Sequence, residues 1–328
     1  MRASEIAQTL DGRLLGDDLS LSAIAPLIDA ASNDLAFVIW PKDIRAAKKS
    51  LAGCLMAELS VAADIADQIT CSLIAIDNFF DAFCLLKGMI KEKKLGPWAK
   101  AHEAASTIEQ GAEVHQSAIV TDSYIGHGAK IGAYAVIGPG SFIGNHTVVE
   151  VGAKIFDDVY VGAHCRIGAN SVLGAQGFIP YGISPCKSLP SLGTVRIGDF
   201  VHIGALCTVD RGLCGPTVIS NHTLIDNMTH IGHDVKIGES VVIAGQSGFA
   251  GFVTVDSFVT IGGQVGIAPH IHIGEWARIS GKSMVHCDIK PYEIWSGNPS
   301  VPHATYLRAY GQLMTAGKGR LRSGKAAC

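Results

Sequence analysis

The chain has 328 residues, of which 38 are glycine and only 17% are charged, and its formal net charge at pH 7 is −3. This charge argues against nucleic-acid binding, which normally requires a clear excess of basic residues. No apolar stretch is long enough to cross a membrane, and the start does not resemble a signal peptide. The nine cysteines contain no CxxC pair, so we expect reduced thiols and a cytoplasmic protein.

The first hundred residues alternate short helical and strand-like segments. Pro41 is placed to open a helix at its first turn, and Asp77 is a typical N-cap residue. Strands are expected over residues 20–24, 35–39, 53–56 and 71–76, and helices over 4–10, 41–50 and 79–89. The pattern predicts a small α/β domain over residues 1–100, followed by a linker over residues 101–113.

The central part of the chain repeats with a period of six. Twelve hexapeptides run from Ile219 to Lys290, each opening on a bulky apolar residue, and an upstream run opens at positions 119 to 173. Gly usually follows the opener, where we expect it to permit strained corners, and a small residue comes four places after the opener. A period of six fits neither a helix nor a single strand, but it is typical of a parallel β-helix with inward-pointing openers. Such a β-helix is expected over residues 114–290.

Two segments depart from the repeat. Residues 179–194 contain three prolines and are expected to leave the coil as an excursion, and such loops often carry function. The period stops after Pro291, so residues 291–328 are expected to form a short helical extension. From Ile294 onward this extension has five basic and no acidic residues, which is compatible with a solvated tail or with a docking arm for an acidic partner.

The strongest candidate for chemistry is His233, which should project outward near a corner of the coil. Gly251 lies eighteen residues later, so its unobstructed N–H should lie beside the imidazole one coil further along. His270 should fall on the same edge. A base next to a free N–H provides proton abstraction and oxyanion stabilisation, which acyl transfer requires. Asp226 is a candidate to orient His233.

Four stretches carry a resemblance to a known family: residues 174–178 (GAQGF), 208–212 (TVDRG), 225–234 (IDNMTHIGHD) and 296–299 (SGNP). In these stretches the chain resembles the UDP-3-O-acylglucosamine N-acyltransferases of lipid A biosynthesis. The resemblance implies a mainly β fold, with a left-handed β-helix, a small N-terminal α/β domain that binds a uridine nucleotide, and a short C-terminal helical tail. It also implies a homotrimer with active sites between subunits.

The resemblance further implies an activity. A 3-hydroxyacyl chain would pass from the phosphopantetheine of acyl carrier protein to the 2-amino group of a UDP-3-O-acylglucosamine, with no metal or other cofactor. His233 matches the family's general base, Gly251 its oxyanion donor, and His270 a second histidine near the reacting groups. Met284 falls where the family measures acyl-chain length.

The resemblance also suggests substrate-binding residues. Phe37 matches the residue that packs against the nucleotide base, and Asp226 is assigned to substrate binding. The chain has Trp40-Pro41-Lys42-Asp43 where the family usually has Asn-Pro-Lys-Tyr, so Trp40 is an alternative stacking surface.

Other functions remain open from the sequence. A solenoid acetyltransferase that uses coenzyme A and a non-catalytic β-helix scaffold are the main alternatives. A metal site among His230, His233, His270 and His272 is a weaker one, because zinc requires three or four convergent ligands. The related O-acyltransferase of the same pathway lacks an N-terminal domain, so the N-acyltransferase is preferred.

Overall fold

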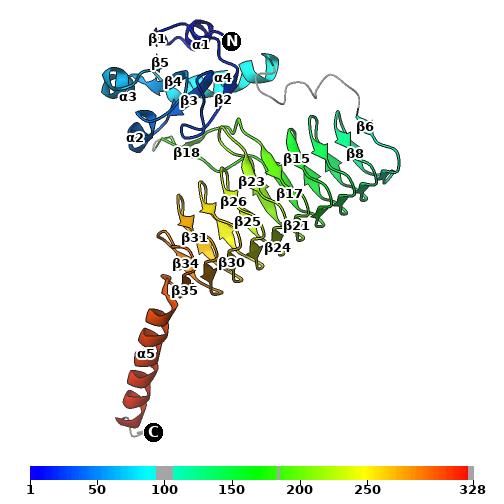
Figure 1. The fold of residues 1–328 in the computed structure, drawn as a ribbon, viewed down its shortest axis with the longest axis vertical. Helices are drawn as coiled ribbons and strands as arrows, with labels where there is room; N and C mark the ends of the chain where they lie inside the picture. Colours follow the sequence, from blue (N-terminus) through cyan, green and yellow to red (C-terminus); the bar gives the residue numbers. More distant parts are fainter. Residues whose placement is uncertain (94–105, 183–184, 324–328) are drawn as a thin grey trace.

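The computed structural model describes residues 1–93, 106–182 and 185–323, without the side chains of residues 90–93 and 317–323. An α/β domain lies beside a long β-helix, and a single helix continues from the far end of the β-helix (Figure 1). The predicted fold class, a mainly β protein built on a left-handed parallel β-helix, is confirmed. No helix in the described part of the chain is long and apolar enough to span a membrane.

The N-terminal domain is a five-stranded sheet in the order β1-β5-β4-β3-β2, in which β1 runs antiparallel to β5 and the other pairs are parallel. The predicted helix over residues 41–50 forms as a short 3₁₀ turn followed by one α-helical turn, and the sequence did not predict β1 or α3. The elements are β1 (Arg13–Leu15), β2 (Ala23–Ile24), β3 (Asp34–Val38), β4 (Cys54–Glu58), β5 (Ser72–Ile76), α1 (Ala3–Thr9), η1 (Pro41–Asp43), α2 (Ile44–Ala47), α3 (Leu59–Ile65), η2 (Ala66–Gln68) and α4 (Phe79–Lys93).

The β-helix consists of three sheets whose strands follow one another in turn around each coil. Sheet 1 contains β7 (Glu113–Val114), β10 (Lys130–Ile131), β13 (Val148–Val149), β16 (Arg166–Ile167), β21 (His202–Ile203), β24 (Leu224–Ile225), β27 (Val242–Ile243), β30 (Thr260–Ile261), β33 (Arg278–Ile279), β35 (Ile294–Ser296) and β36 (Val301–Pro302). Sheet 2 contains β8 (Ile119–Val120), β11 (Val136–Ile137), β14 (Lys154–Ile155), β17 (Val172–Ala175), β22 (Thr208–Asp210), β25 (His230–Ile231), β28 (Gly248–Phe249), β31 (Gly266–Ile267) and β34 (Met284–Val285). Sheet 3 contains β6 (Thr107–Ile108), β9 (Tyr124–Ile125), β12 (Phe142–Ile143), β15 (Val159–Val161), β20 (Val195–Ile197), β23 (Thr217–Ile219), β26 (Lys236–Ile237), β29 (Thr254–Val255) and β32 (His272–Ile273).

The openers of the hexapeptides form the core, as the sequence predicts. All those between Ile219 and Val285 are buried in one continuous cluster. Ile119, the first opener of the upstream run, is an exception, because it is 59% exposed. Val120 instead pairs with Ile137, so this coil is one residue shorter than the regular repeat and Val120 takes the inner position.

Glycine has a different role from the predicted one. The left-handed backbone conformation lies three residues after the opener, and non-glycine residues such as Asp234 (φ 57°) and His270 (φ 62°) adopt it. The glycine directly after the opener is required by close packing. An added Cβ on Gly132, for example, would lie 2.8 Å from the backbone nitrogen of Val151 in the next coil. These glycines therefore allow the coils to stack closely.

The boundaries of the β-helix extend beyond those predicted. β6 begins at Thr107, within the predicted linker, whose residues 101–105 lie outside the described residues. Sheet 1 continues to β35 and β36, past residue 290, before α5 (His303–Ser323) begins. The predicted excursion leaves the coil as a hairpin of β18 (Pro180–Tyr181) and β19 (Lys187–Ser188).

The excursion attaches the N-terminal domain to the β-helix. Ile179 and Leu189 are buried in the same apolar cluster as Phe79 of α4, and Leu213 of the β-helix joins them. The Tyr181 hydroxyl donates to the Glu58 carboxylate over 2.6 Å. This shared core positions the domain against the coils that carry the candidate site.

Candidate active site

A cavity of about 730 Å³ lies between sheet 2, the start of the excursion and the turn after β3. Five of the seven residues predicted as site residues line it, although they come from both parts of the protein. They are Trp40, His233, Gly251, His270 and Met284.

His233 follows β25 and is almost completely buried at a corner of the coil. Its Nδ1 lies 2.9 Å from Oδ2 of Asp234, and the N–H of Leu213 donates to the same oxygen over 2.7 Å. An acceptor-only carboxylate at this position favours the tautomer with the proton on Nδ1. The Nε2 of His233 is then left as a proton acceptor.

Two glycines enclose the His233 side chain. An added Cβ on Gly251 would overlap Cε1 and Nε2 of the imidazole, and one on Gly177 would lie 2.8 Å from the Cβ of His233. Among the described residues, no acceptor is hydrogen bonded to the N–H of Gly251. The structure therefore places Gly251 beside the imidazole, where the spacing of eighteen predicted it, and its backbone N–H has no partner among the described residues.

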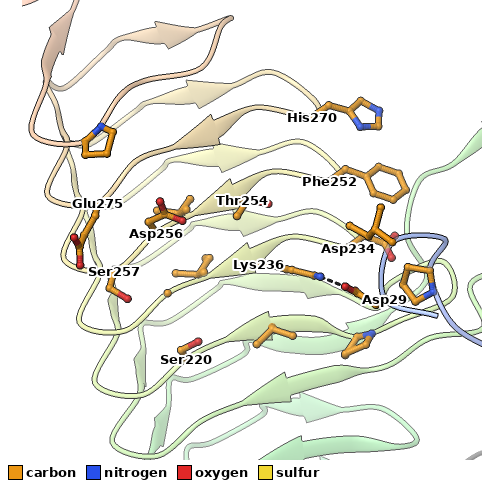
Figure 2. Close-up of a pocket in the computed structure, with 18 residues that line it drawn as sticks. Asp29, Ser220, Asp234, Lys236, Phe252, Thr254, Asp256, Ser257, His270 and Glu275 are labelled. Carbon is orange, nitrogen blue, oxygen red and sulfur yellow. Dashed lines mark hydrogen bonds and ion pairs between the residues drawn. The ribbon is translucent and has the colours of Figure 1, made fainter. Parts of the chain in front are cut away.

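His270 lies on the same edge of the β-helix. Its ring stacks on Phe252 at 4.9 Å and an angle of 4°, and Phe252 meets His233 edge-on at 5.1 Å. Figure 2 shows Asp234, Phe252 and His270 on successive coils of this edge, with the Lys236–Asp29 ion pair on the adjoining face. Burial lowers the pKa of His270, and nearby Lys42 lowers it further.

A shallow groove runs along sheet 2 from His230 to Met284. The ladder places Gly248 and Gly266 between these two side chains. An added Cβ on Gly248 would meet no atom within 4 Å, and one on Gly266 would meet only Met284 Sδ, at 3.8 Å. Three strand spacings give the groove a length of roughly 14 Å. Its glycine floor leaves room for an unbranched apolar chain.

Asp210 is a cavity residue that the sequence analysis did not select. Its Oδ2 lies 3.9 Å from Nε2 of His230, and its side chain is 12% exposed. Burial raises the pKa of Asp210, while His230 and His233 act in the opposite direction. A short insertion at residues 215–218, before β23, interrupts the repeat here, so Thr208 pairs with His230 across twenty-two residues rather than eighteen. The period of eighteen therefore did not indicate that Asp210 lies next to His230.

The structure does not place Phe37 at a binding surface, in contrast to what the resemblance implied. Its side chain is 4% exposed and packs edge-on against Phe79 and Phe83, with ring centroids 6.0 and 5.0 Å away. It belongs to the core of the N-terminal domain and has no face free for a base. Trp40, the predicted alternative, lines the cavity, and the Lys42 ammonium lies 5.2 Å from its ring centroid.

Asp226 does not orient His233 in this structure, contrary to the prediction. Its carboxylate accepts hydrogen bonds from the N–H groups of Asn227 and Gly245, on another edge of the β-helix. Asp234 takes the orienting position because it directly follows His233 in the corner. Within the described residues, no three His, Cys, Asp or Glu side chains are placed to share a metal ion.

Comparisons with known proteins relate the chain to acyltransferases. No family model matches the sequence. It is 34% identical over 238 residues to the UDP-3-O-acylglucosamine N-acyltransferase of Acinetobacter baylyi, covering 66% of this chain and 62% of that protein. It is 32% identical over 323 residues to the enzyme of the same name from Herminiimonas arsenicoxydans, and this match covers 88% of this chain and 85% of that protein. Several other curated relatives are matched over about half their length, such as 47% of the Methylorubrum extorquens protein.

Two solved structures have a similar fold. The UDP-N-acetylglucosamine acyltransferase of Francisella novicida is 29% identical with a TM-score of 0.50, and the match covers 60% of this chain and 69% of that one. The Campylobacter jejuni protein of the same name is 27% identical with a TM-score of 0.50, and the match covers 67% of this chain and 86% of that one.

Proposed function

Because the chain belongs to the family of UDP-3-O-acylglucosamine N-acyltransferases, we propose that it transfers a 3-hydroxyacyl chain from acyl carrier protein to the 2-amino group of a UDP-3-O-acylglucosamine. The observation that carries the proposal is the pairing of His233 with Asp234 and Gly251. A groove floored by glycine leads along sheet 2 from this edge to Met284.

The geometry supports a direct acyl transfer. The acceptor amine attacks the thioester carbonyl, and Nε2 of His233 accepts the proton that the nitrogen loses. The N–H of Gly251 donates to the oxyanion of the tetrahedral intermediate, and His270 lies near enough on the same edge to assist. The carbon–sulfur bond then breaks, and the imidazolium returns its proton to the departing thiolate.

The test of the proposed function is an acyl-transfer assay with UDP-3-O-acylglucosamine as acceptor. It offers the same 3-hydroxyacyl group on acyl carrier protein and on coenzyme A. The proposal expects an amide product that forms at a higher kcat/KM with the carrier protein. A preference for acetyl-coenzyme A would favour the alternative acetyltransferase, and no transfer from either donor would favour a scaffold.

The groove predicts how acyl-chain length is selected. Gly266→Met would place a side chain on the groove floor, and we expect it to lower kcat/KM for the best substrate by about tenfold while shorter chains are less affected. Met284→Ala should shift the preference to longer chains. The measurement is kcat/KM over a series of acyl-carrier-protein thioesters. Met228→Ala, at an exposed site on another edge, is the matched control, and an unchanged length profile in both groove variants would contradict the assignment.

We also propose that the protein is a homotrimer whose neighbouring subunit completes the site. One edge of the β-helix exposes a ladder of aromatic side chains, including Phe200, Phe258, Trp276 and Tyr292. A row of exposed aromatic side chains along one edge is typical of a protein–protein interface. Sedimentation velocity is expected to give a trimer, and a stable monomer at micromolar concentration would contradict this proposal.

The basic tail is proposed to dock the acidic carrier protein. Arg308 lies exposed on α5, and Arg320 follows on the same helix. Reversing both residues to Glu should raise the KM for the carrier with little change in kcat, and should reduce the dependence of KM on salt. Arg13→Glu, on β1, is the control. Identical donor kinetics across a salt series would remove the docking role. The absence of a further cofactor and the cytoplasmic location remain predictions.

A further inference from the structure

The N-terminal domain reaches the catalytic edge of the β-helix through Lys42. Its Nζ lies 2.8 Å from Nε2 of His270, although the two residues are 228 positions apart in the chain. Lys42 and Trp40 both line the cavity that contains His233 and Gly251. The domain that the resemblance associates with nucleotide binding therefore also contacts a histidine of the reaction site.

The chemistry of this contact determines the state of the imidazole. A lysine ammonium has three N–H donors and no acceptor, so Nε2 of His270 must accept. The imidazole is then neutral and carries its proton on Nδ1. A second positive charge on His270 would lie next to that of Lys42, and this repulsion acts together with burial to lower the pKa of His270.

Other titratable groups near His270 shift its protonation in opposite directions. Asp43 favours the protonated form of His270, and His233 disfavours it. Asp234 is bonded to His233, while Asp210 and His230 lie near each other further along the same cavity. In the described part of the chain, Lys42 is the group within hydrogen-bonding distance of the His270 ring, so it has the most direct control over the tautomer.

Aromatic rings support both partners of this contact. The Trp40 ring lies 5.2 Å from the Lys42 ammonium, and Phe252 stacks in parallel on His270 at 4.9 Å. Phe252 then meets His233 edge-on. A continuous series of contacts thus runs from the turn after β3 to the candidate base, and both side chains of the polar contact are restricted by a neighbouring ring.

We propose that Lys42 is a positioning residue for the transfer reaction, which donates to Nε2 of His270 and thereby holds that imidazole neutral, with Nδ1–H as its available donor. This inference rests on the proposed function, because the donor would serve the reacting groups in the acyl-transfer site. It assigns the N-terminal domain a role in the chemistry in addition to substrate binding.

The first test needs no substrate and follows the imidazole directly. The ¹⁵N and ¹³C resonances of the His270 side chain are assigned by their loss in His270→Ala and titrated in the native protein, Lys42→Met, Lys42→Arg and the control Lys49→Met. Lys42→Met should raise the pKa of His270 and lower the population of the Nδ1–H tautomer, whereas Lys42→Arg and Lys49→Met should resemble the native protein. Identical tautomer and titration in Lys42→Met would overturn the proposal, whether or not acyl transfer is observed.

The second test asks whether the tautomer affects the reaction. Lys42→Met is expected to lower kcat by roughly tenfold, less than the loss of a principal oxyanion donor, with a smaller change in KM for the sugar nucleotide. Lys42→Arg should recover most of this loss. A change confined to KM would assign Lys42 to substrate binding, and this would overturn its positioning role even if the resonances of His270 respond.

Discussion

His233→Ala should lower turnover at least about a hundredfold, because general-base catalysis typically contributes factors of 10² to 10⁴. The Asp234 carboxylate accepts a hydrogen bond from Nδ1 of His233, and this leaves Nε2 of His233 free to accept the proton of the amine. Turnover is measured at saturating substrates, together with circular dichroism and sedimentation, which should be unchanged. His270→Ala should have a smaller effect, because Gly251 would still donate.

The matched control for this prediction is His115→Ala. His115 is an exposed histidine in the first coil of the β-helix, where its Nδ1 lies 2.9 Å from the Ser117 hydroxyl, and it does not line the cavity. Its loss should leave turnover unchanged. Activity of His233→Ala within a few-fold of the native protein would show that His233 is only a corner residue.

Gly251→Ala should have an effect of similar size, although it removes no functional group. The new Cβ would overlap Cε1 and Nε2 of His233, and Gly177 packs closely against Cβ and Cγ of the same side chain. The ring must therefore move, and a misplacement of about 1 Å can reduce a rate roughly a hundredfold. The measurement is kcat, combined with the thermal midpoint to verify folding.

Gly88→Ala provides the comparison for Gly251→Ala. An added Cβ on Gly88 would meet no atom within 4 Å, and the residue lies in α4, where alanine is favoured over glycine. This variant should retain full activity with equal or higher stability. Native turnover in Gly251→Ala would show that the ring can shift without loss, and would remove the argument that glycine is required there.

The period of six predicted much of the fold and part of the candidate site. It placed Gly251 beside His233 because axial neighbours in a regular β-helix are eighteen residues apart, and the ladder has this register from β25 to β34. Asp210 was missed because the insertion before β23 lengthens this coil from eighteen to twenty-two residues, so the regular spacing does not place Asp210 next to His230. Asp226 was misassigned as the orienting group although it precedes His233 by only seven residues, about a third of a coil, and follows β24 of sheet 1 rather than β25 of sheet 2.

Phe37 illustrates a different difficulty. Four of the five residues of β3 are buried, because apolar clusters cover both faces of the N-terminal sheet. A strand buried on both faces shows no alternation of polar and apolar residues, so the sequence could not indicate whether Phe37 faced the core or a ligand. The contact between Lys42 and His270 was equally inaccessible, since it depends on how two separate domains pack.

The core shared by the N-terminal domain and the excursion affects how the β-helix opens. In a stack where each coil contacts only its neighbours, local unfolding begins at the ends and proceeds inward. Phe79 packs in one cluster with Ile179, Leu213 and Phe252. The N-terminal domain therefore contacts coils of the β-helix that are not adjacent to one another. Fraying must break this cluster before it reaches His233. His233 and Gly251 therefore lie in the segment of the solenoid that stays closed longest, and His270 lies one coil outside it.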